Sequence, residues 1–375
     1  MPPALAHPPT FRQLHLGLDL SGAGAVPASW TGGPRVARQF DAGRTADLVA
    51  DAERALLDLV TFDDAFALKP TGRELRGHLD SAVGVSRLAR TTSRIGLVAS
   101  LDPSRVPREH VITALASLDR ATGGRAAWQL EPRAGEAARI LPAVNGVRAG
   151  LPGPRTPLVV VRAATYMDLV EVAHRADVVR LRATDLGQAA AMRRALRAVA
   201  AGAGRDPDSI RVLLEARVVL AADETGAQLR AELAGVTAEA ADTLTHIGTA
   251  RGFAAIIAQA AVEDAVDGFH LLPAHLDADV PVITHRLVPM LRRAGLFRSE
   301  YPGTSLRATL GVPEQTVPGA AGRAAGVRPA AARPATTRAP QAAAQPAPAR
   351  RRSRRTAGAA PAQPRPVVVR ELETA

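Results

Sequence analysis

The segment from Arg94 to Glu131 constrains the fold more than any other, because it has the pattern of a strand, a helix and a second strand. Residues 94–101 form an apolar run of strand length. From Arg108 to Asp119 apolar residues recur at helical spacing, and Gly123-Gly124 ends the pattern. Residues 124–130 read as the next strand. Buried strands joined by a helix predict a parallel sheet covered by helices, with ligands at the carboxyl ends of the strands.

This unit recurs along most of the chain. Strands are predicted at residues 15–20, 58–62, 94–101, 124–130, 157–161, 177–181, 211–220 and 268–272. Helices are predicted at 45–57, 79–91, 108–119, 136–141, 167–175, 187–201, 225–233, 249–261 and 283–294. Eight strands with intervening helices predict an α/β fold, a closed (β/α)8 TIM barrel rather than an open sheet. We expect this barrel domain to span residues 1–313.

The composition changes after Pro313 to Ala, Pro and Arg. Residues 314–375 contain 11 Arg and 3 Glu, so they carry +8 of the net charge of +11 and leave +3 for the rest. A segment with so few bulky apolar residues is predicted to be a disordered basic tail. The run Arg350–Arg355 could attract nucleic acid or an acidic partner, but no aromatic residue accompanies it for base stacking. A solvated tail is the preferred interpretation, and nucleic-acid binding is not expected.

Composition also excludes several kinds of site. The 375-residue chain has no cysteine, which rules out disulfides, thiolate nucleophiles and zinc bound by cysteine. No apolar run approaches the roughly 20 residues of a membrane-spanning helix. The start of the chain lacks the charged and apolar regions of a signal peptide. We therefore expect a cytoplasmic protein with no membrane segment.

Candidate site residues follow the predicted strands. The acid pair Asp63-Asp64 could position a ligand or cap the next segment, and His110 could act as a general acid or simply begin a helix. Trp128 suits a core or a pocket wall. His270 and His275 lack a convincing acidic third ligand, so no metal site is predicted.

Two arginines alternate on one predicted strand. Arg180 and Arg182 point to the same side, where they could face an anionic ligand or pair with Asp177 and Asp185. Pairing in solvent is the preferred interpretation.

Four stretches carry a resemblance to a known family. They are Leu59–Ala67, Thr92–Ala99, His110–Asp119 with Gly123–Trp128, and Asp267–Arg307, the last being the most specific. Together they resemble the bacterial luciferase-like, flavin-dependent monooxygenases, in the branch that includes nitrilotriacetate monooxygenase. The resemblance spans roughly residues 12–313 and implies an eight-stranded barrel.

The resemblance also implies a function. Members of this family use reduced FMN, supplied by a separate flavin reductase, to activate oxygen and oxygenate a small organic substrate. Asp64, Ser100 and Gln129 match positions that contact the flavin, and Thr165 lies in the loop that matches the phosphate-binding loop. His110 is the predicted catalytic residue. Family members are commonly dimers, so a homodimer is expected.

Two departures from the family leave alternatives open. The excursion between the fourth and fifth strands is reduced to residues 132–156, and Ala164-Thr165-Tyr166 replaces a loop rich in Gly and Ser. The chain could instead use a deazaflavin and transfer hydride without oxygen. It could also be a catalytically silent barrel that serves as a binding or partner subunit.

Overall fold

The computed structural model describes most of the chain up to Pro313. The described residues are 13–21, 24–25, 41–62, 69–71, 74–76, 80–133, 135–152, 156–238 and 242–313. Asp63, Asp64 and the predicted basic tail at 314–375 lie outside them, so those predictions stay predictions. No helix of the described residues is long and apolar enough to cross a membrane.

Eight parallel strands close into a barrel, as the sequence predicts. They are β1 (His15–Asp19), β2 (Leu59–Thr61), β5 (Gly96–Ser100), β6 (Ala126–Leu130), β7 (Leu158–Ala163), β8 (Val178–Leu181), β9 (Arg211–Ala221) and β11 (Gly268–Pro273). Each strand pairs in parallel with the next in this order, and β11 pairs with β1 to complete the ring. The prediction of a (β/α)8 barrel is confirmed.

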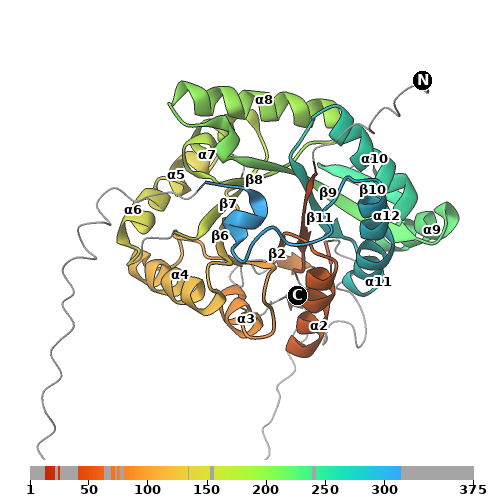
Figure 1. Ribbon diagram of the computed structural model, residues 1–375, viewed down its shortest axis with the longest axis horizontal. Coiled ribbons are helices and arrows are strands. Elements are labelled where there is room, and N and C mark those ends of the chain that lie inside the picture. Colours follow the sequence, from red (N-terminus) through yellow and green to blue (C-terminus); the bar gives the residue numbers. More distant parts are fainter. Residues whose placement is uncertain are drawn as a thin grey trace, which may run out of the picture. The chain divides into compact units, whose positions relative to one another are not determined.

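Helices surround the strands, as Figure 1 shows. They are α2 (Ala42–Arg54), α3 (Ser81–Leu88), α4 (Arg108–Thr122), α5 (Ala137–Ile140), α6 (Ala143–Gly150), α7 (Leu169–Arg175), α8 (Leu186–Gly202), α9 (Glu224–Ala234), α10 (Ala250–Val262), α11 (Leu276–Val282), α12 (Val288–Arg293) and α13 (Leu306–Leu310). Local signals set their ends: Asp185 accepts the N–H of Gln188 at the start of α8, and Gly123 ends α4 with φ +66°.

The structure adds elements that the sequence pattern does not reveal. A short antiparallel hairpin joins β3 (Lys69–Thr71) to β4 (Glu74–Arg76). β10 (Leu244–Thr249) pairs with the second half of β9, beyond the end of β8. The helix predicted at 283–294 begins earlier, as α11, and continues through a π-helical segment at Ile283–Leu287 into α12.

The barrel interior has an apolar half and a polar half. The apolar half is a cluster of buried residues in which strand side chains pack against α13 and the segment just after it: Leu59, Val98, Ala127, Leu158, Val160, Val178, Leu213, Leu306, Leu310 and Val312. Side chains two positions further along a strand point to the same face. The next inward positions toward the carboxyl ends are polar, and they form the candidate site.

Candidate active site at the carboxyl ends of the strands

Polar side chains from all eight barrel strands and from the residue after β6 meet inside the carboxyl half of the barrel. We call this set the polar layer: Asp19, Thr61, Ser100, Gln129, Glu131, Arg162, Arg180, Glu215 and His270. Ligands bind at this end of TIM barrels. The layer is therefore where chemistry is expected.

Arg180 lies at the centre of the polar layer. Its side chain is 1% exposed, and Nη1 donates to Gln129 Oε1 and to Glu131 Oε1, both at 2.7 Å. Its Nη2 lies 2.7 Å from Glu215 Oε1. Burial lowers the pKa of this guanidinium, but Glu215 and Glu131 outweigh burial and raise the pKa above its ordinary value. Arg180 is therefore a fixed cation whose two terminal nitrogens are paired, while its Nε has no hydrogen-bond partner among the described residues.

The predicted pairing of Arg180 in solvent with Asp177 and Asp185 is wrong. Arg180 points into the barrel, whereas Asp177 precedes β8 and pairs with Arg148 at 2.7 Å. Asp185 follows the strand and caps α8. Residues three apart on a strand face opposite sides, which is why Asp177 cannot meet Arg180.

Glu215 holds three arginines in the barrel. Its carboxylate is fully buried and lies 3.1 Å from Arg162 Nε, 2.7 Å from Arg180 Nη2 and 3.7 Å from Arg182 Nε. Arg162 also pairs with Glu131 at 3.1 Å. These contacts form an alternating network of charges, and breaking one of them would leave a buried ion uncompensated.

His270 is a buried, neutral histidine beside this network. Its Nε2 lies 3.1 Å from the Thr61 hydroxyl, which donates to Asp19 at 3.3 Å. Burial, with the nearby charges of Arg180 and Arg162, lowers the pKa of His270 well below its usual value. A Cβ on Gly17 would lie 2.5 Å from His270 Nδ1, so the glycine makes room for the ring.

Two of the predicted flavin contacts come together in this layer. The Gln129 amide nitrogen donates to Ser100 Oγ at 2.9 Å, and the Ser100 hydroxyl donates to the Phe62 carbonyl at 2.8 Å. Both side chains are buried. His110, by contrast, is an exposed residue in the first turn of α4, where its side chain makes no hydrogen bond with a described residue.

The loop after β7 is already occupied by a carboxylate. Thr165 donates its hydroxyl to Asp168 at 2.8 Å and its N–H to the same oxygen at 3.2 Å. Gly135, from the short segment after β6, donates its N–H to the other oxygen of Asp168 at 3.3 Å. Asp168 is 3% exposed. The described residues of this loop do not fit the phosphate of FMN, because a carboxylate holds the donors that a phosphate would need.

Two arginines stand at the outer rim of the polar layer. Arg182 and Arg217 both approach Asp242, which is 58% exposed; Arg182 forms a close ion pair with it, and Arg217 lies 3.8 Å away. Arg217 Nε is buried without a hydrogen-bond partner among the described residues, and burial lowers the pKa of its guanidinium. Arg217 is thus a weakly compensated cation.

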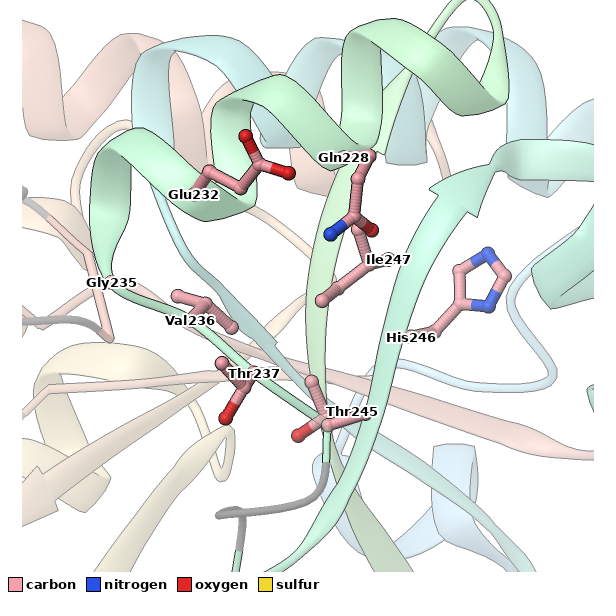
Figure 2. Close-up of a pocket in the computed structure, with 9 residues that line it drawn as sticks. Gln228, Glu232, Gly235, Val236, Thr237, Thr245, His246 and Ile247 are labelled. Carbon is pink, nitrogen blue, oxygen red and sulfur yellow. The ribbon is translucent and has the colours of Figure 1, made fainter.

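A separate cavity lies outside the polar layer. It has a volume of about 540 Å³ and is bounded by α9, the segment after it and β10 (Figure 2). His246 lines it, donating from Nε2 to the Thr249 carbonyl at 3.0 Å and packing against Phe253. None of the polar-layer side chains lines this cavity, and no group of three metal-ligating side chains occurs among the described residues.

The site contains residues that sequence reasoning did not single out. Asp19, Glu215 and Arg217 received no role from the pattern, although each is a charged residue in an otherwise apolar strand segment. A charged residue at an inward strand position can indicate a site in the sequence, because a buried ion requires a partner.

Two curated relatives are monooxygenases by name. The chain is 40% identical over 65 residues to nitrilotriacetate monooxygenase component A of Aminobacter aminovorans, a stretch that covers 17% of this chain and 14% of that protein. It is 23% identical to N-acetyl-S-(2-succino)cysteine monooxygenase of Bacillus subtilis, over 80% of this chain and 97% of that protein. No family model matches the chain.

Solved structures share the fold. EDTA monooxygenase from Chelativorans sp. superposes with a TM-score of 0.71 at 17% identity, over 80% of this chain and 99% of that one. Long-chain alkane monooxygenase gives 0.69 at 15% identity, over 84% and 99%. The predicted resemblance is confirmed. A coenzyme F420-dependent tetrahydromethanopterin reductase from Methanopyrus kandleri gives 0.55 at 13% identity, over 74% and 99%.

Proposed function

We propose that this chain is the oxygenase of a two-component, flavin-dependent monooxygenase that acts on a small organic acid. The observation that carries the proposal is the polar layer, which lies where TIM barrels bind ligands. The similarity to named monooxygenases supports the reaction class, and the name "component A" supports a separate reductase. A bound reduced flavin would supply the chemistry that activates molecular oxygen.

The chain's own residues would position the reactants. The ion pairs of Arg180 with buried Glu215 and half-buried Glu131 hold the layer in place, so that the Ser100 and Gln129 side chains keep fixed directions. The neutral ring of His270, joined through Thr61 to Asp19, offers a hydrogen bond without a charge. Predicted contacts of Asp64 and a catalytic role of His110 stay predictions.

The rim arginines support an acidic substrate. A carboxylate at this rim would give Arg217 a closer partner than Asp242, which lies 3.8 Å away, and it would compete with exposed Asp242 for Arg182. Three of the similar monooxygenases are named for polyacids, namely EDTA, nitrilotriacetate and N-acetyl-S-(2-succino)cysteine. An organic acid is therefore the substrate class that we would screen first.

The test is oxygen uptake by the purified chain. A flavin reductase, NADH, flavin and a panel of organic acids would be supplied, with catalase present to remove peroxide formed by free flavin. We expect one or more acids to give a hydroxylated or cleaved product, and Arg217→Gln to raise KM with little change in kcat. No product from any acid, with uncoupled oxygen uptake equal to that of the reductase alone, would refute the proposal.

A second candidate function has its own observation. Asp168 fills the loop after β7, and the paired ions fill the barrel centre, as expected for a barrel that serves as a binding or partner subunit without catalysis. Absence of binding to FMN, riboflavin and deazaflavin would favour it. Anaerobic hydride transfer to an oxidised deazaflavin, or from a reduced one, would instead favour the F420-type alternative, which one of the similar structures represents.

A homodimer stays a prediction of the resemblance. Size-exclusion chromatography with light scattering would measure it directly, and a monomer at every concentration would contradict it.

A further inference from the structure

We propose that Asp168 acts as an internal substitute for a phosphate, so that the barrel takes its flavin without anchoring a phosphate at the loop after β7. Riboflavin or another phosphate-free flavin is then bound at least as well as FMN. The inference rests on the proposed function in one respect, namely that the barrel mouth takes a flavin.

The geometry of the loop carries this inference. Three donors converge on one carboxylate: the Thr165 hydroxyl, the Thr165 N–H and the Gly135 N–H, at 2.8, 3.2 and 3.3 Å. Hydroxyl and backbone N–H groups at the start of a helical segment are the usual donors to a phosphate. Here Asp168 takes them within the chain.

Two segments cooperate in this arrangement. Asp168 ends the 3-10 turn Tyr166–Asp168 that leads into α7, while Gly135 belongs to the segment between β6 and β7. Gly135 has φ +80°, a conformation that favours glycine, and this backbone turns its N–H toward Asp168. The short connection thus closes over the loop and seals the carboxylate, which is 3% exposed.

Charge gives the arrangement its selectivity. A phosphate brought to these donors would face the buried Asp168 carboxylate at close range, with little water to screen the repulsion. Among the described residues no cation pairs with Asp168, and its carboxylate is held by the three neutral donors. A ligand with a neutral ribityl hydroxyl in this place avoids the repulsion.

The experiment compares two flavins on matched variants of the full chain. Binding of riboflavin and of FMN would be measured by quenching of flavin fluorescence, and again anaerobically by ultrafiltration with dithionite-reduced flavins. The readout is the ratio of the two Kd values, which needs no turnover. The variants are wild type, Asp168→Asn, Asp168→Glu and Asp223→Asn, the last of which alters an exposed cap of α9 that accepts the Gly226 N–H.

For wild type we expect FMN to bind no tighter than riboflavin. Asp168→Asn should shift the ratio of Kd values by tenfold or more in favour of FMN, because the amide keeps an acceptor for Thr165 and removes the charge. Asp168→Glu and Asp223→Asn should leave the ratio unchanged. Thermal unfolding of each variant would show that it is folded at the temperature of the assay.

Two results would overturn the inference. One is a wild-type chain that binds FMN tenfold or more tightly than riboflavin. The other is an unchanged ratio in Asp168→Asn. A chain that binds neither flavin would overturn the inference together with the flavin premise of the proposed function. These outcomes are separable from failure of the proposed function, because a chain that prefers riboflavin and turns over no acid would retain the inference while losing the activity.

Discussion

Replacing Glu215 by Gln should destabilise the barrel strongly. The substitution keeps the shape of the side chain and removes a fully buried carboxylate that lies within 3.7 Å of Arg162, Arg180 and Arg182. At roughly 4 Å between charge centres, one such pair is worth about 4 kcal/mol at an effective dielectric constant of about 20. Removing one partner of a buried pair costs about 3–5 kcal/mol, so we expect the free energy of unfolding to fall by that amount.

Urea unfolding measures this loss directly. Far-UV circular dichroism and the fluorescence of buried Trp128 report the same transition if unfolding is two-state. For a chain of this size, about 2 °C in Tm per kcal/mol converts the loss to a fall of about 6–10 °C. As a matched control, Glu136→Gln breaks the exposed pair of Arg139 and Glu136 and should cost less than about 1 kcal/mol.

A double-mutant cycle separates charge from packing. Arg180→Met alone leaves Glu215 with fewer partners, whereas the double variant Arg180→Met with Glu215→Gln removes both charges and leaves Arg162 paired with Glu131. We expect the double variant to be about 2–3 kcal/mol more stable than the sum of the single effects predicts. Additive effects, or a single Glu215→Gln variant as stable as the surface control, would refute the electrostatic account of this layer.

Three further predictions concern the residues around β1. Gly17→Ala should cost about 1–3 kcal/mol in urea unfolding, because its Cβ would meet His270 Nδ1 at 2.5 Å and Leu59 Cδ1 at 2.9 Å; an unchanged midpoint would contradict this contact. The pKa of His270 is lower in the folded chain than in the unfolded chain, so below about pH 6.5 the unfolded chain binds a proton that the folded chain does not bind. The free energy of unfolding therefore falls as the pH drops below about 6.5. His270→Gln should weaken this fall between pH 7 and 5. Burial raises the pKa of Asp58, but His15 and Arg298 outweigh burial and lower it, so the Asp58 carboxylate stabilises the folded chain above about pH 4 and this stabilisation is lost below. Asp58→Asn should therefore be less stable than wild type at pH 7, and its stability should change less between pH 4 and 2. Equal slopes of stability against pH in the two proteins would argue against the ion pair.

The sequence predicts the barrel because each strand is a run of buried apolar residues. Parallel strands covered by helices are buried on both faces, so such runs stand out, and all eight predicted barrel strands are present. β10 escapes prediction because Leu244–Thr249 includes Thr, His and Gly and is mostly half-buried. α6 escapes because two glycines interrupt it and only Val144 and Val147 are buried.

The candidate site is only partly predictable, because its contacts depend on which strands are neighbours. The positions of Ser100 and Gln129 follow from strand ends alone, and the structure joins them directly. The partners of Arg180 come from β9 and from the residue after β6, so local spacing favoured Asp177 and Asp185 instead. The Asp168 cap has a local signal, since Thr165 and Asp168 have the spacing of a capping box.

The packing of α13 into the barrel also sets when folding can finish during synthesis. Leu306, Leu310 and Val312 complete the apolar cluster that contains Leu59 and Val98, and β11 must join β1 before the ring closes. Domains generally fold as they emerge, amino end first, yet the apolar cluster of this barrel is incomplete until residue 312 has been synthesised. A nascent chain that stops before α13 therefore exposes an apolar cavity, and we expect it to depend on chaperones more than the finished chain does.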